Sequence, residues 1–482
     1  MKSSSTLVDK SSSIKAADMQ TALLLLAEGL LVFGVWRCRG WYSLPSLILV
    51  TVAFAVLLFL FLRRHFEGFD SLVVPGTGLL CVGMLLTDLV VVDPLLFGHS
   101  PQIIFLKALP FLAVGLLGAG WWTGRDRLGR LALAAGVLGF ALYLAAQLLR
   151  TPSPVMDVWT ITTEAAEAFL AGKNPYRLFY TDVYEKAGMP GYGYEMRFIY
   201  LPGHLLHAAL PAAFGLDIRW VSLVAIAGGL GLFAWIVECN SSRMLRVGAG
   251  TAVIIFWVHG GQPYLLEQSW PEAMLLVYLC LALWAWSSRP RIACIALVLA
   301  LSLKQTTWFF APFLIALLVA ERRWGVIAVV AGGVALIVSP FFFWDPHAFF
   351  ENVVLDLLQK SPRPNALSWA SVVLRRVPSA FALITALSYV VYFAALAMLI
   401  NRLRKRPREE WLAETEKWMI VGVFGFFLFL KQAFFNYYYL VSGLLAFYLI
   451  REALGGDGAA DPQLQGSAAA KPNLSDEESH TG

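Results

Sequence analysis

An acidic residue follows a long apolar run near the middle of the chain. The segment 154–176 reads PVMDVWTITTEAAEAFLAGKNPY, and Asp157 is its first charged residue. A carboxylate there can cap the N-terminus of a helix or act as a general base at a membrane surface. The residues after Asp157 are amphipathic with a helical period, and Glu164 shares the polar face of Asp157. We predict a short helix that starts at Asp157 and ends at Gly172.

Two short corners between apolar runs each carry a lysine followed by a glutamine. The first is Lys304-Gln305, and the second is Lys431-Gln432, with Asn436 close behind it. A lysine at a helix end usually extends to the lipid headgroup level. An ammonium at that depth can also bind a phosphate. Both lysines are therefore candidate phosphate ligands.

Two further polar stretches interrupt the apolar pattern. In HGGQPYLLEQSWPEA, residues 259–273, Gln262 and Glu267 would be costly at membrane depth, and Gly-Gly and Pro would break a helix. Broken backbone is tolerated there where it lines a cavity. The later stretch 345–379 is rich in Phe and Trp and contains Arg375-Arg376, which could bind an anionic headgroup or a phosphate substrate.

The composition indicates which elements must position these groups. The chain has 482 residues, of which 59% are hydrophobic and 14% charged, whereas soluble domains have about 25% charged residues. An all-α polytopic membrane protein follows from this. The net charge of +5 is too small to indicate nucleic-acid binding. The cysteines show no metal-ligand or CxxC spacing and are expected to be small buried hydrophobes: Cys38, Cys81, Cys239, Cys280 and Cys294.

Apolar runs predict about fourteen transmembrane helices, with a range of twelve to fifteen. The candidate spans are 20–36, 44–62, 72–92, 103–122, 128–149, 218–236, 247–261, 271–287, 292–303, 308–320, 324–343, 380–400, 417–430 and 434–450.

The basic clusters orient these spans. If the N-terminus is cytoplasmic and the spans alternate, most clusters fall inside, as the positive-inside rule requires. These are Arg63-Arg64, Arg125/Arg127/Arg130, Arg243/Arg246, Arg289/Arg291, Arg322-Arg323 and Arg402–Arg408. Arg37 and Arg39 are the exception, because they fall outside. The count also requires that 198–215 does not cross, and its prolines and histidines suit an interfacial helix.

This orientation divides the chain into five parts. We expect a disordered cytoplasmic tail (1–19), N-terminal transmembrane helices (20–149), an outer loop with juxtamembrane helices (150–217), a transmembrane core (218–450) and a second disordered cytoplasmic tail (451–482). The core includes the second outer loop, 345–379. The candidate site therefore lies on the periplasmic or extracellular side of the plasma (inner) membrane.

The common motifs of soluble enzymes do not occur in the sequence. We find no P-loop, no GxGxxG after a strand, no HExxH and no GxSxG. A paired Asp-x-Asp, which would hold the metal of a nucleotide-sugar donor, is also missing. No cofactor is evident, and a divalent metal is possible but unsupported.

In their order along the chain, these pieces resemble the GT-C superfamily of integral membrane glycosyltransferases. The nearest resemblance is to bacterial mannosyltransferases that use a polyprenol-phosphate sugar. It is carried by Asp157 after a span, AGKNPY at 171–176, FIYLPGHLL at 198–206, SLKQTTWFFAPFL at 302–314 and KQAFFNYYY at 431–439, with weaker matches at Gly261-Gln262 and PFFFWDPHAF at 340–349. Gly203 stands where the family often has a second proline. The resemblance covers about 150–450, and the earlier helices are expected to be an addition.

The resemblance implies transfer of a sugar, with mannose favoured, from a polyprenol-phosphate donor to a lipid or glycan acceptor with inversion. Asp157 would be the general base, with Glu164, Asp182 and Glu195 as reserve acids. The donor phosphate would bind Lys304 first, and then Arg375, Arg376 and Lys431. The substrate pocket would contain Tyr176, Tyr200, His204, Gln262, Glu267, Gln305 and Asn436.

Two other functions remain open at this point. A lipid or polysaccharide transporter or flippase would also be polytopic, although transporters often show internal repeats, and we see none. A non-catalytic membrane protein that assists a polymerase is the third possibility. Neither the sugar nor the acceptor follows from the sequence.

Overall fold

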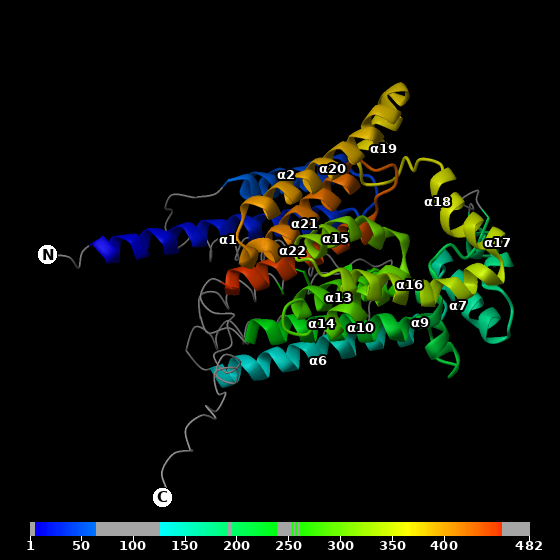
Figure 1. The fold of residues 1–482 in the computed structure, drawn as a ribbon. Coiled ribbons are helices and arrows are strands. Elements are labelled where there is room, and N and C mark those ends of the chain that lie inside the picture. Colours follow the sequence, from blue (N-terminus) through cyan, green and yellow to red (C-terminus); the bar gives the residue numbers. More distant parts are fainter. Residues whose placement is uncertain are drawn as a thin grey trace, which may run out of the picture.

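The chain forms a helical bundle in the computed structural model, which describes residues 5–63, 126–189, 195–238, 253, 256, 257 and 261–455 (Figure 1). Within these ranges there is no β-strand, and a single isolated bridge joins Trp41 to Ala366. The predicted all-α class is therefore supported for the described part of the chain.

The N-terminal half contains α1 (Ser5–Arg37), α2 (Leu44–Leu62), α6 (Asp126–Arg150), α7 (Asp157–Leu170), η1 (Pro175–Arg177), α8 (Val183–Lys186), α9 (Pro202–Ala212) and α10 (Arg219–Glu238). The C-terminal half contains α12 (Gly261–Glu267), α13 (Glu272–Ala285), α14 (Pro290–Leu303), η2 (Gln305–Phe309), α15 (Ala311–Ala320), α16 (Trp324–Trp344), α17 (Pro346–Phe350), the π-helix η3 (Glu351–Leu355), α18 (Asp356–Gln359), α19 (Trp369–Arg376), η4 (Pro378–Ala380), α20 (Phe381–Lys405), η5 (Arg408–Glu410), α21 (Trp411–Phe429) and α22 (Phe435–Gly455).

In the part of the chain that the structure describes, five helical segments are long and apolar enough to cross a membrane. They are Gln20–Arg37, Leu44–Leu62, Arg219–Val237, Trp324–Trp344 and Pro378–Lys405. Shorter apolar helices occupy other expected spans, such as α13, α14 and α15. The expected spans 72–92 and 103–122, and nearly all of 247–261, lie outside the described residues. Several apolar helices thus indicate a membrane protein, while the total of fourteen spans stays a prediction.

Two of the long helices present apolar side chains outward. Only 11% of the α16 span and 22% of the segment Pro378–Lys405 are buried in the protein, although their mean hydropathies are 2.5 and 2.2. Leu336 and Leu383 are about three-quarters exposed, at 75% and 76%. Apolar surface of this extent is costly in water and is stable against lipid tails.

The two ends of the bundle differ. Helix α1 begins and α22 ends on the left of Figure 1, whereas α7, α9, α17 and α18 gather on the right. The two segments that we expected to form large outer loops therefore share one end, opposite the start of α1. Which end faces the cytoplasm stays a prediction.

Backbone hydrogen bonds fasten three distant corners together. The amide of Tyr42, just before α2, donates to the carbonyl of Asn365 at 2.8 Å. The amide of Leu367 donates to the carbonyl of Ala433, just before α22, also at 2.8 Å. The segment 360–368 thus lies between the loop after α1 and the corner before α22. Helices α1 and α2, which flank that loop, therefore pack within the bundle.

Segment 198–215 forms a short helix, as its composition suggested. Helix α9 has 11 residues and is about 16 Å long at 1.5 Å per residue, against about 30 Å of membrane hydrocarbon. It packs against α7 and α14. A Cβ on Gly203 would lie 2.5 Å from the carbonyl oxygen of Ser302 in α14, so glycine permits this close approach where the family often has proline.

Helix α7 runs from Asp157 to Leu170, and Gly172 follows it with a φ of +74°. The predicted amphipathic helix and its glycine stop are confirmed. The expectation that Asp157 caps the helix needs a correction, because Met156 is the N-cap residue and Asp157 is the first helical residue.

Candidate active site

A cavity of about 150 Å³ opens beside Asp157. Its charged lining residues are Asp157, Arg39 and Arg363. The remaining lining residues are mostly aromatic: Trp41, Met156, Val158, Tyr184, Tyr264, Gln268, Trp270 and Phe434. A carboxylate and two guanidinium groups among aromatic rings match the needs of a ligand that carries both a phosphate and a sugar.

The carboxylate of Asp157 is held in one orientation. Its Oδ1 accepts a hydrogen bond from the amide of Val158 at 2.8 Å and from the hydroxyl of Tyr184 at 3.3 Å. Tyr184 lies in α8, a four-residue helix whose first amides are capped by the Asp182 carboxylate. This predicted reserve acid therefore has a structural role, which indirectly positions the Asp157 carboxylate.

Arg39 reaches the cavity through an unusual end of α1. The amide of Arg39 donates to the carbonyl of Trp36 at 2.9 Å, and the amide of Gly40 donates to the carbonyl of Val35 at 3.0 Å. These two bonds form a Schellman motif, in which the residue at the Arg39 position is usually glycine because φ is positive. Arg39 has a φ of 52° there. Glycine would adopt this backbone conformation without strain, so the presence of arginine at position 39 marks it as a candidate functional residue.

Gly40 allows this turn to pack tightly against the start of α22. Its φ is +73°, and a Cβ at this position would lie 2.0 Å from the backbone nitrogen of Phe435. No side chain fits in that space. The turn that presents Arg39 and Trp41 is therefore fixed by direct contact between backbones.

The end of α12 forms another wall of the cavity. The amide of Ser269 donates to Leu266 at 3.1 Å and that of Trp270 donates to Leu265 at 3.3 Å, so α12 also ends in a Schellman motif. Ser269 has a φ of 58°. This turn directs Gln268 and Trp270 to the cavity, as its lining shows.

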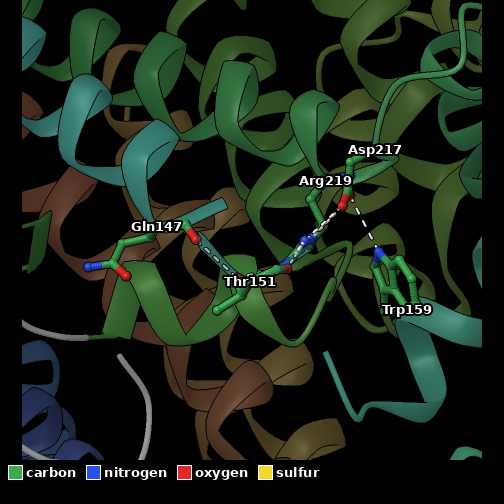
Figure 2. Close-up of polar contacts among 5 residues, drawn as sticks. All are labelled: Gln147, Thr151, Trp159, Asp217 and Arg219. Atoms are coloured by element: carbon green, nitrogen blue, oxygen red, sulfur yellow. Dashed lines mark hydrogen bonds and ion pairs between the residues drawn. The ribbon is translucent and has the colours of Figure 1, made fainter. Parts of the chain in front are cut away.

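A buried arginine ties the outer loop to the bundle, as Figure 2 shows. The side chain of Arg219, at the start of α10, is 0% exposed and forms an ion pair with Asp217 at 2.7 Å. It also donates to the hydroxyl of Thr151, after α6, at 3.2 Å. The indole of Trp159 in α7 donates to Asp217 at 3.4 Å. The first turn of α7, which begins at Asp157, is therefore linked through Trp159 to the end of α6 and the start of α10.

Lys304 forms a separate buried cluster and does not line the cavity. Its Nζ lies 2.6 Å from Oε1 of Glu272, whose side chain is 0% exposed. The same oxygen accepts from the amide of Asn436 at 2.8 Å. The rings of Tyr200 and Tyr437 lie 5.4 Å and 5.7 Å from the ammonium. The expected neighbours Tyr200 and Asn436 do meet Lys304, around an acid that we had not singled out.

Two of the other predicted phosphate ligands, Lys431 and Arg375, bind the protein backbone. Lys431 donates to the carbonyls of Leu358 at 3.0 Å and Lys360 at 2.9 Å, and burial together with Lys360 lowers its pKa. Arg375 donates to the carbonyl of Pro364 at 2.7 Å and lies over the Tyr42 ring. These contacts hold the segment that carries Arg363. Arg376 is exposed at the end of α19.

The reserve acids Glu164 and Glu195 also have protein partners. Glu164 accepts from the amide of Thr181 at 3.0 Å. Glu195 pairs with Arg197 at 2.7 Å and is 63% exposed. Neither residue lines the cavity.

The expected pocket residues Tyr176, Gln262 and Gln305 join elements of the fold. The hydroxyl of Tyr176 donates to the carbonyl of Tyr200 at 2.9 Å. Gln262 accepts from the hydroxyl of Tyr439 at 2.9 Å. The amide of Gln305 donates to the carbonyls of Ile199 at 2.7 Å and Val353 at 2.9 Å.

His204 is a neutral packing residue under the outer loop. Its Nε2 lies 3.3 Å from the hydroxyl of Thr162, and its ring stacks on Phe198. Burial, with smaller effects of His207 and Lys304, lowers the pKa of His204 to about 3. An imidazole of this kind cannot supply a positive charge to a phosphate at neutral pH.

Sequence reasoning missed Arg39, Arg363 and Trp41 as cavity residues. One signal was present, because Arg39 belongs to the basic pair that violates the positive-inside pattern. In the predicted topology Arg39 falls on the outer side, where the positive-inside rule disfavours it. Binding of an anionic group by Arg39 would explain that placement.

Among the described residues, no three or more His, Cys, Asp or Glu side chains are grouped so that they could hold a metal ion. We compared the chain with protein-family models, curated proteins and solved structures, and none of them matches it.

Proposed function

We propose that this protein is a membrane glycosyltransferase of the GT-C type. It moves a sugar, with mannose favoured, from a polyprenol-phosphate donor to a lipid or glycan acceptor. The reaction takes place on the outer face of the plasma membrane, with both termini in the cytoplasm. The basis for the class is the ordered set of motifs from Asp157 to the corner at Lys431.

The observation that carries the proposal is the cavity beside Asp157. It combines one oriented carboxylate with the guanidinium groups of Arg39 and Arg363 and with several aromatic walls. A transporter needs no oriented carboxylate beside paired cations at one end of the bundle. A transferase needs both, because it must accept a proton and stabilise a leaving phosphate.

The chemistry assigns one task to each group. Asp157 accepts the proton of the acceptor hydroxyl, whose oxygen forms a new bond to C1 of the sugar. The bond between C1 and the phosphate oxygen breaks, and the electron pair leaves with the lipid phosphate. Attack opposite to the leaving group gives inversion. Arg39 and Arg363 stabilise the charge on that phosphate, and each guanidinium has five N–H donors for this purpose.

This assignment moves the phosphate contact away from Lys304. The ammonium of Lys304 is already 2.6 Å from the buried carboxylate of Glu272. To bind a phosphate it would leave a carboxylate uncompensated in the protein interior, at a cost of about 3–5 kcal/mol. Arg39 and Arg363, in contrast, line the cavity itself.

The test is a direct assay of purified protein in lipid vesicles. Radiolabelled polyprenol-phosphate-mannose is supplied with a crude lipid and glycan acceptor fraction. The proposal predicts that the label leaves the donor and that free polyprenyl phosphate accumulates. If the donor remains intact while the protein moves labelled lipid between leaflets, the flippase function replaces this one.

A further inference from the structure

One polar side chain in the cavity wall is buried without a partner. Gln268 lines the cavity beside Asp157 and is only 7% exposed, whereas the predicted pocket residue Glu267, directly before it, does not line the cavity. The carboxamide of Gln268 has one oxygen acceptor and two N–H donors. Within the part of the chain that the structure describes, this side chain forms no hydrogen bond. A buried carboxamide without partners is costly, so its presence at a ligand cavity calls for an explanation.

The backbone at the end of α12 fixes the position of Gln268. Its amide donates to the carbonyl of Tyr264 at 3.0 Å. The next residue, Ser269, is buried and has a φ of 58°, a conformation that residues other than glycine rarely adopt. Gln268 is therefore placed at the cavity by the turn, and its side chain stays available to a ligand.

The aromatic walls of the cavity are also held in place. The ring of Trp270 stacks on Phe435 with centroids 6.3 Å apart and an interplanar angle of 24°, and it meets the Tyr264 ring edge-on at 5.5 Å. Trp41 meets the Phe434 ring at 5.7 Å and 66°. Rings of this kind offer apolar surface to the C–H faces of a sugar, and a carboxamide can pair with its hydroxyl groups. A mostly aromatic wall with a few placed polar groups is the usual composition of a small-molecule site.

The size of the cavity suits a single ring. Its volume is about 150 Å³, and a cavity of about this volume binds one six-membered ring in a protein interior. The phosphate of the donor is bonded directly to its sugar. A phosphate at Arg39 and Arg363 would therefore bring that sugar into the same cavity.

We infer that Gln268 is a specificity-determining residue, whose carboxamide hydrogen-bonds a hydroxyl group of the sugar that is transferred. The inference rests on the proposed function, which supplies that sugar. A sugar that lacks the hydroxyl leaves the buried carboxamide unpaired, so the site selects against it. An acceptor glycan carries the same hydroxyl chemistry. The donor is favoured because the two arginines line the cavity with Gln268.

The experiment compares donors that differ by one hydroxyl group. Transfer is measured from polyprenol-phosphate-mannose and from the set of synthetic analogues that each lack a single hydroxyl of the sugar. For one analogue, we expect kcat/KM of the wild-type protein to fall by about 5- to 150-fold. Methionine has a similar length and no strong hydrogen-bonding group, so Gln268→Met should transfer that sugar about as well as mannose. The other analogues should keep their wild-type ratios to mannose.

Two controls separate recognition from damage to the fold. Gln359→Met is the same change at the exposed end of α18 and should keep the wild-type ratios. A general loss of structure would lower transfer from every donor by a similar factor. Gln268→Met should be no less stable than wild type in thermal unfolding, because it removes an unpaired polar group. Gln268→Ala, which cannot overfill the wall, gives the same ratios if Gln268→Met does not fold.

Donor binding without acceptor identifies the source of the hydroxyl. The inference requires that Gln268→Met also loses the difference in affinity between mannose and that analogue. If donor affinities are unchanged and only the KM for the acceptor rises, the hydroxyl belongs to the acceptor and the inference is overturned. It is also overturned if Gln268→Met discriminates among the donors as the wild type does, while the proposed function stands. If the wild-type protein transfers sugar from no donor, the proposed function itself fails.

Discussion

The ammonium of Lys304 lies 2.6 Å from the carboxylate of Glu272, and both groups are withdrawn from solvent, with 12% and 0% of their side chains exposed. This pairing joins the end of α14 to the start of α13. Lys304, the lysine of the SLKQTTWFF motif, therefore already forms an ion pair within the protein. The basic residues that line the cavity beside Asp157 are Arg39 and Arg363.

We predict that Lys304→Met destabilises the protein by about 3–5 kcal/mol, because it leaves the Glu272 carboxylate buried and unpaired. The double variant Lys304→Met/Glu272→Met should recover most of that loss, since it removes both charges. Chemical denaturation in detergent measures the two free energies of unfolding. A Lys304→Met protein that is fully stable but does not bind donor would show instead that Lys304 contacts the phosphate.

We predict that Arg363→Gln raises the KM for the polyprenol-phosphate donor by about ten- to a hundredfold, since a hydrogen bond to a charged group contributes about 1.5–3 kcal/mol. Arg39→Gln should have a similar effect, because Arg39 lines the same cavity. The matched control is Arg376→Gln, a change of the same type on the exposed end of α19. The assignment of the phosphate site is wrong if Arg376→Gln raises KM and Arg363→Gln does not.

We predict that Gly40→Ala reduces both stability and transfer. The new Cβ would lie 2.0 Å from the nitrogen of Phe435, so the turn must move and carry Arg39 away from the cavity. Gly172→Ala is the matched control, because its φ is +74° and a Cβ there meets nothing within 4 Å. It should cost only about 1–2 kcal/mol of backbone strain. Equal transfer by the two variants would argue against a role for the turn.

The features of the fold that were predicted from the sequence are those that depend on residues close together in the chain. The amphipathic period after Asp157 and the glycine at 172 correctly indicated α7 and its end. The composition of 198–215 suggested a short helix, and α9 has 11 residues. That this segment lies at the interface without crossing stays a prediction. These features depend on neighbouring residues, so they can be read from one stretch of chain.

The composition of the cavity depends on contacts between distant residues. Arg39 and Arg363 line the same cavity because backbone bonds join residues 42 and 365, and 367 and 433. Nothing in the spacing of these residues indicates that pairing. The partner of Lys304 was missed for a related reason. Glu267 and Glu272 lie in one polar stretch, and the left-handed turn at Ser269 decides which of them faces the lysine.

We predict that acid destabilises the protein partly through His204. Its pKa is about 3 when folded, below the usual value of about 6.5, so the unfolded chain binds the proton more strongly. This contribution to stability is complete above about pH 6.5 and is lost as pH falls, by at most about 1.4 kcal/mol per pH unit. Thermal unfolding from about pH 5 to pH 7 should be less pH-dependent in His204→Gln. If the pH dependence of thermal unfolding is the same in His204→Gln and wild type, protonation of His204 does not destabilise the folded protein.

The central claim, that Asp157 is the general base, is tested most directly by Asp157→Asn. Asparagine keeps the shape of the side chain but cannot accept the proton, so transfer from radiolabelled polyprenol-phosphate-mannose should fall by about 10²–10⁴-fold. Donor binding and thermal stability should be retained. Glu167→Gln, the same change on the exposed side of α7, should transfer at the wild-type rate. Transfer by Asp157→Asn at the wild-type rate would contradict the account.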